Sequence, residues 1–130
     1  MSERPLSPFL SVYKFKYTLV TSILNRVAGL ILSGGLILLV YWLVALAGGA
    51  RNYAQARHVL SLPVCKLVYL LLIAAFVYHL VAGLRHLVWD CGIGLERAAA
   101  RRSAWIVAVV SLLLSAILAL CLLRPGAYSP

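Results

Sequence analysis

His79 is the residue of this 130-residue chain whose type and position most require a chemical explanation. It lies in an apolar run with no charged side chain from Leu67 to Leu84, and His86 follows seven residues later. On a helix these two imidazoles share a face, about 10 Å apart along the axis. An imidazole at membrane depth is costly unless a partner or ligand satisfies it. Because a neutral imidazole nitrogen suits iron and an apolar slot suits porphyrin, His79 is a candidate haem-iron ligand. The competing interpretation is an imidazole hydrogen-bonded to a neighbouring helix.

A second candidate site lies nearer the N-terminus, on the stretch SILNRVAG at residues 22–29. Ser22, Arg26, Gly29 and Ser33 follow the spacing i, i+4, i+7 and i+11, so on a helix they form one stripe. Small residues allow a helix or a flat ligand to approach the backbone, and the guanidinium fork of Arg26 can hold a carbonyl or a carboxylate. The alternative is a helix-packing stripe with a snorkelling arginine.

Small residues also flank His79 on its own predicted face. Ala75, His79, Ala82 and His86 repeat the same spacing, which predicts room beside the imidazole for a wide, flat group. Since His86 shares that face and His58 belongs to the opposite connection, neither can ligate the far side of a haem held by His79. We therefore expect any second axial ligand to come from another polypeptide.

Arg85 and His86 are adjacent and fall near a predicted membrane boundary. The plainest interpretation is a solvated pair that contacts lipid phosphates.

The elements that must position these residues follow from the composition. The chain is 64% apolar, has a mean hydropathy of +1.00 and contains only three acidic residues, which excludes an ordinary water-soluble domain. Charged side chains are absent between Arg26 and Arg51, between Lys66 and Arg85, and between Arg102 and Arg124. About 20 apolar residues cross a bilayer as a helix, so we predict an all-α fold with three transmembrane helices.

We place these helices at residues 17–47, 63–88 and 103–123 of a single membrane-anchor domain, 1–130. The pair Gly48-Gly49 is predicted to end the first helix, Pro63 to open the second and Ser103 to cap the third. Residues 1–16 lack the apolar core of a signal peptide and are predicted to be an interfacial segment.

Basic residues predict the orientation. One side carries eight lysines and arginines and the other four. The richer side is expected to face the cytoplasm, together with the N-terminus, and the absence of a targeting leader favours a bacterial inner membrane over a mitochondrial one. The charges are spread over helix ends and form no basic patch, so we expect no nucleic-acid binding.

Other chemistry is poorly supported. The three cysteines are far apart and form no C-x-x-C pair, and no two carboxylates can pair within the apolar region, so we expect no iron–sulfur or zinc site and no catalytic residue in this chain. A small transporter or channel is a weak alternative, because repeated elements are missing.

Three segments together resemble a known family. RPLSP at residues 4–8, SILNRVAG at 22–29, and His79 followed by GLRHLVWD at 83–90 resemble the cytochrome b membrane-anchor subunit of succinate dehydrogenase, respiratory complex II. The resemblance covers nearly the whole chain. It implies partners: a second anchor subunit completing a larger helical bundle, a flavoprotein subunit and an iron–sulfur subunit. It also implies a shared haem b and electron transfer from succinate to ubiquinone or another quinone.

The resemblance also assigns roles to residues. It implies that His79 is the haem-iron ligand, that Ser22 and Arg26 bind quinone, and that Arg26 lies near a haem propionate. Asn25 and His86 are implied to lie near the propionates, with Asp90 close to the same boundary. The family usually has histidine where this chain has Asn25, which can donate a hydrogen bond but cannot carry a positive charge. The alternative is a haem-free structural anchor of a fumarate reductase-like complex.

Overall fold

The computed structural model describes residues 17–124, and within that range the chain is built from helices without strands. Three helices are long and apolar enough to cross a membrane: α1 (Tyr17–Ala47), α3 (Pro63–Asp90) and α4 (Arg97–Leu123). The prediction of an all-α fold with three spans is therefore confirmed. The interfacial segment predicted at residues 1–16 lies outside the described residues.

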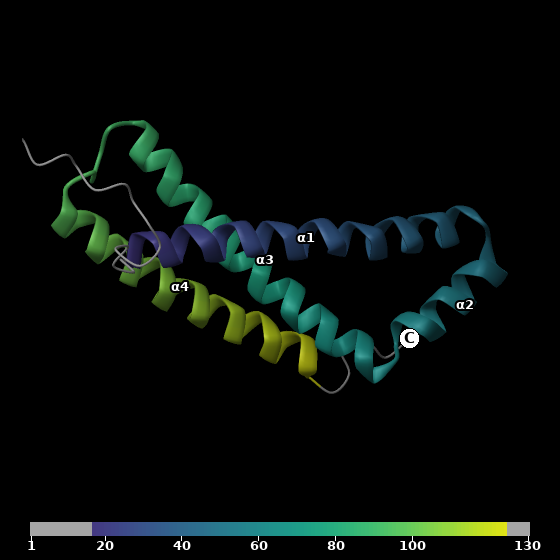
Figure 1. Cartoon of the computed structure of the whole chain (residues 1–130). Coiled ribbons are helices and arrows are strands. Elements are labelled where there is room, and N and C mark those ends of the chain that lie inside the picture. The colour runs from purple at the N-terminus through teal and green to yellow at the C-terminus, as the bar shows by residue number, and fades with distance from the viewer. Residues whose placement is uncertain (1–16, 125–130) are drawn as a thin grey trace, which may run out of the picture.

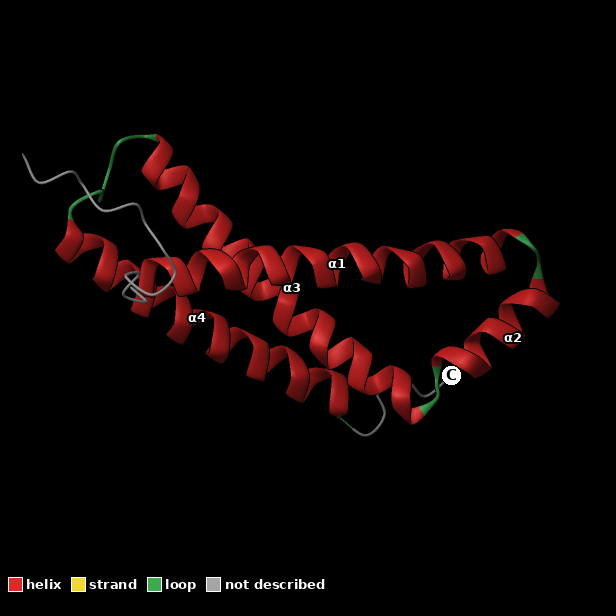
Figure 2. Ribbon diagram, viewed as in Figure 1, coloured by secondary structure: helices red, strands yellow, loops and turns green. Residues whose placement is uncertain are grey.

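α3 is the central helix. It crosses α1 obliquely and has α4 alongside it, and α1 also contacts α4 (Figure 1). The first residues of α1 and α4 lie on the same side as the last residues of α3 (Figure 2). The opposite side holds a helix that the sequence analysis missed, α2 (Ala50–Leu60), which contacts α1.

Glycine and proline set the ends of the first spans as predicted. α1 ends at Ala47, and Gly49 adopts a φ of 88°, a left-handed conformation that favours glycine. Pro63 opens α3, where the missing N–H of proline costs no helical hydrogen bond. Between them the hydroxyl of Tyr69 donates to the backbone oxygen of Leu60 at 3.0 Å, which ties the end of α2 to α3.

One predicted boundary was wrong, and another lies two residues from the observed helix end. α3 continues to Asp90, and α4 begins at Arg97 rather than at Ser103. Ser103 therefore lies inside α4, and its hydroxyl donates to the backbone oxygen of Ala100 at 3.1 Å instead of capping a helix. The start of α4 was missed because arginines in its first turns are also typical of a polar connection between helices.

The buried apolar side chains are small, as expected where membrane helices approach closely. They are alanines and valines, namely Ala28, Ala45, Ala56, Ala75, Val77, Ala82, Ala100, Ala104 and Val107. Large residues face outward, and Leu30, Ile37 and Leu112 are each more than 70% exposed. This distribution suits helices whose outer faces meet lipid or other subunits.

Candidate functional site

His79 lies where α3 crosses α1, and its ring is hydrogen-bonded to the backbone of α1. The Nδ1 atom lies 3.1 Å from the backbone oxygen of Asn25. A carbonyl oxygen can only accept, so Nδ1 is the donor in this contact, and in a neutral ring Nε2 is then the nitrogen with the lone pair. Nε2 has no hydrogen-bond partner among the residues described by the structure. This hydrogen bond to α1 is the contact that the competing interpretation of His79 predicts, and it leaves Nε2 as the ring nitrogen that is open to a ligand.

Gly29 makes this close approach of α1 to His79 possible. A Cβ atom added at Gly29 would lie 3.2 Å from Cε1 of the imidazole and 3.5 Å from its Nδ1. The first distance is shorter than an ordinary carbon–carbon contact. Asn25 and Gly29 are one helical turn apart, so a single face of α1 offers the carbonyl and the space that the ring occupies.

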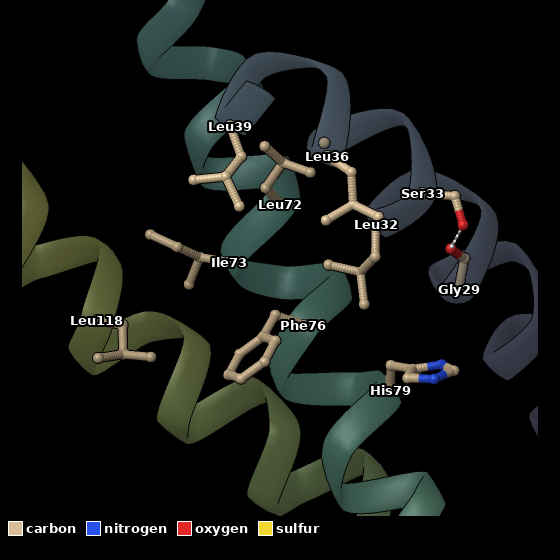
Figure 3. Close-up of a pocket in the computed structure, with 11 residues that line it drawn as sticks. Gly29, Leu32, Ser33, Leu36, Leu39, Leu72, Ile73, Phe76, His79 and Leu118 are labelled. Atoms are coloured by element: carbon tan, nitrogen blue, oxygen red, sulfur yellow. Dashed lines mark hydrogen bonds between the residues drawn. The ribbon is translucent and has the colours of Figure 1, made fainter. Parts of the chain in front are cut away.

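An apolar groove of about 610 Å³ begins at His79 and runs along the crossing of α1 and α3 (Figure 3). His79 lies at one end of the groove, and Leu39 and Leu72 lie at the other. Phe76 and Leu118 line its α4 side. The lining is almost entirely hydrocarbon, and the hydroxyl of Ser33 donates to the backbone oxygen of Gly29 at 3.0 Å.

The predicted stripe on α1 has two different parts. Gly29 packs on His79, whereas Arg26 is exposed and Ser22 is half-buried. Asn25 is half-buried, and its Oδ1 atom is buried without a hydrogen-bond partner within residues 17–124. A buried amide oxygen without a donor is costly, so α1 offers a polar atom that residues 17–124 do not satisfy.

The predicted space over Ala75 and Ala82 is not open. The two alanines are 6% and 3% exposed, because the chain packs on them itself. Gly29 provides the space that the imidazole itself occupies.

Arg85 corrects the sequence analysis most clearly. It was interpreted as one of a solvated pair at lipid phosphates, yet it is only 8% exposed. Its guanidinium lies over the Trp89 ring, with Cζ 3.9 Å from the ring centroid. His86 is half-buried and meets Trp89 edge to face, with ring centroids 5.3 Å apart, and Asp90 is exposed.

Sequence reasoning also missed Tyr78 and Thr21. The hydroxyl of Tyr78 donates to the backbone oxygen of Thr21 at 3.1 Å, and Arg85 reaches the Thr21 hydroxyl at 3.3 Å. A tyrosine and a threonine at helical depth carry a weak signal, because each is also common in membrane helices. Their pairing depends on the crossing of α1 and α3.

Comparisons with known proteins agree on one family. Residues 1–118 match the family described as succinate dehydrogenase/fumarate reductase transmembrane subunit. The chain is 36% identical over 117 residues to the succinate dehydrogenase cytochrome b556 subunit of Rickettsia felis, covering 90% of this chain and 91% of that protein.

Two further relatives carry similar names. The succinate dehydrogenase cytochrome b556 subunit of Paracoccus denitrificans is 39% identical over 102 residues, which is 78% of each chain. The mitochondrial succinate dehydrogenase cytochrome b560 subunit of Mus musculus is 37% identical over 97 residues, which is 72% of this chain and 57% of the mouse protein.

Proposed function

This chain belongs to the succinate dehydrogenase/fumarate reductase transmembrane subunit family, and we propose that it holds one side of a haem b and part of a quinone site. It is a membrane-anchor subunit of succinate dehydrogenase. The names of the relatives include cytochrome b556 and b560, which favours a haem-binding anchor over the haem-free alternative. The succinate chemistry belongs to other subunits of such a complex.

The observation that carries the haem proposal is that Nε2 of His79 has no hydrogen-bond partner among residues 17–124. The Nδ1–H of this ring donates to the backbone oxygen of Asn25, which leaves Nε2 as a metal ligand of defined direction. The apolar groove that begins at His79 fits a flat macrocycle, whereas Gly29 makes room for the imidazole itself. Haem b, when bound, supplies a one-electron carrier within the membrane. The second axial ligand is proposed to come from the other anchor subunit, because His86 is on α3 itself and His58 lies in α2.

Ser22 and Arg26 are proposed to bind the quinone head group. They lie within the first three turns of α1, one helical turn apart, and Arg26 is exposed while Ser22 is half-buried. A serine hydroxyl and a guanidinium donate hydrogen bonds to quinone oxygens, and the fixed charge of Arg26 stabilises negative charge that develops on reduction. Asn25 and His86 are proposed to lie near the haem propionates, and the unpaired oxygen of Asn25 supports a site completed by another molecule.

The assembly is proposed to contain a flavoprotein, an iron–sulfur subunit and a second membrane anchor. The side that holds the N-terminus and the α3–α4 connection is proposed to face the cytoplasm of a bacterial inner membrane, because it carries eight of the twelve basic residues. Electrons arriving from a soluble partner on that side would meet the quinone near Ser22 and Arg26. Lipid and a quinone are the remaining expected contacts of this chain.

The haem assignment is tested with His79→Ala in the purified complex. We expect the visible spectrum of the b-type haem to disappear or shift strongly, because the iron loses an axial ligand. His58→Ala is the matched control, since His58 is exposed in α2. An unchanged spectrum in His79→Ala would defeat the ligand assignment.

The quinone assignment is tested with Arg26→Leu. We expect quinone reduction to fall while succinate oxidation with a soluble artificial acceptor survives. Arg57→Leu, an exposed arginine of α2, is the control for loss of charge. Loss of both activities together with loss of subunits would make Arg26 a structural residue.

A further inference from the structure

Arg85 is a buried cation that the proposed function does not use. It lies on the membrane-spanning helix α3, is 8% exposed, and forms no ion pair with a carboxylate of the described residues. The two acidic residues in that part of the chain, Asp90 and Glu96, are both exposed. A buried guanidinium is costly unless its N–H groups are hydrogen-bonded, so its neutral partners require an explanation.

Those partners lie on both neighbouring helices. Nε donates to the hydroxyl of Ser103 at 2.9 Å and Nη2 to the backbone oxygen of Ala100 at 2.9 Å, both on α4. Nη1 donates to the hydroxyl of Thr21 on α1 at 3.3 Å. The indole of Trp89 covers one face of the guanidinium. One planar group therefore joins α1, α3 and α4 near their ends.

The α1 end of this connection lies beside the proposed quinone residues. The carbonyls of Thr21 and Asn25 are one helical turn apart, and they accept from Tyr78 and His79 respectively. Arg85 adds a contact to the side chain of Thr21. Ser22 directly follows Thr21, and Arg26 directly follows Asn25. The bonds from α3 thus fix the position along α1 at which Ser22 and Arg26 are held.

We propose that Arg85 is a positioning residue for quinone binding, acting through Thr21 on α1 and through Ser103 and Ala100 on α4. This inference rests on the proposed function of Ser22 and Arg26. The relevant property is the shape of the guanidinium rather than its charge. Lysine has the same charge, but its donors share one nitrogen and cannot reach three acceptors on two helices in a fixed plane.

The test uses the assembled complex with Arg85→Gln, Arg85→Lys and, as a mild variant, Thr21→Val. We expect the KM for a soluble ubiquinone analogue to rise between about tenfold and a hundredfold in both Arg85 variants, because misplaced binding groups lose effective contact. A rise of about two- to tenfold is expected for Thr21→Val, which removes the hydroxyl that accepts from Arg85 and keeps the arginine. Haem content and succinate oxidation with a soluble acceptor should be unchanged.

Arg102→Gln is the matched control, since Arg102 is an exposed arginine of α4 and loses the same charge. A wild-type KM in Arg85→Lys would overturn the inference by showing that charge alone suffices. An equal KM in Arg85→Gln and Arg102→Gln would also overturn it. If the Arg85 variants do not assemble, Thr21→Val decides, and an intact complex with unchanged KM refutes the positioning role.

Arg26→Leu separates this inference from the proposed function. A raised KM in Arg26→Leu with an unchanged KM in Arg85→Gln removes only the role of Arg85. An unchanged KM in Arg26→Leu removes the proposed quinone site itself.

Discussion

The contact between Gly29 and His79 allows a sharp test with Gly29→Ala. The new Cβ atom would lie 3.2 Å from Cε1 of the imidazole, whereas carbon atoms in ordinary contact are about 3.5–4.0 Å apart. The ring must therefore move away from α1 by a few tenths of an ångström. The same movement lengthens the bond from Nδ1 to the oxygen of Asn25, which at 3.1 Å is already near the long end of the usual range.

The expected magnitude follows from that hydrogen bond. A backbone hydrogen bond contributes about 0.5–1.5 kcal/mol net, which corresponds to a change of about two- to tenfold in an equilibrium constant. Losing the group that orients a ligating histidine typically lowers metal affinity by about tenfold or more. We therefore expect Gly29→Ala to lower haem retention by about two- to tenfold while the subunits still assemble.

Gly34→Ala provides the matched control. Both changes replace a glycine of α1 by a better helix former, and a Cβ atom added at Gly34 would meet no atom within 4 Å. The assay is the haem-to-protein ratio and the reduced-minus-oxidised spectrum of each purified complex. Equal haem content and equal spectra in the two variants would refute the reasoning that the glycine makes room for the ring.

Three further predictions concern other positions. Asn25→His should raise the haem midpoint potential below about pH 6.5, because an imidazolium near the propionates stabilises the reduced haem. A midpoint potential that is unchanged and independent of pH would contradict the proposed place of this side chain. Ser111→Ala should leave the stability of the complex unchanged or raise it by up to about 1 kcal/mol, because the buried hydroxyl has no hydrogen-bond partner within residues 17–124. A lower thermal midpoint of haem loss in this variant would show that another subunit supplies a partner for the hydroxyl. A membrane-impermeant maleimide should label Cys91 only in inverted vesicles and Gln55→Cys only in intact spheroplasts, since both positions are exposed and the two lie on opposite sides of the spans. Labelling of both from the same side would refute the three-span topology, and the opposite pattern would reverse the orientation.

The amino-acid sequence alone determined the three spans, because the transfer of a helix into lipid depends on the local run of apolar residues. The gaps between charged residues predicted the three long helices, and the glycines and the proline marked two of their ends. α2 was missed because its 11 residues include two arginines and a histidine, a composition that is also typical of a polar connection between spans. The start of α4 was missed for the same reason, since arginines occupy its first turns.

The candidate site was only partly visible in the sequence. His79 stood out because an imidazole is rare in an apolar run, and the structure adds the backbone oxygen of Asn25 that accepts a hydrogen bond from its Nδ1 atom. A backbone carbonyl has no sequence signal, because every residue carries one. The burial of Arg85 could not be predicted from the sequence either, because an arginine five residues before the end of a span is typical of a surface group. Its environment depends on Thr21 and Ser103, which lie 64 and 18 residues away in the chain. Local composition decides whether a segment enters the membrane, and the crossing of the helices decides which polar groups meet inside it.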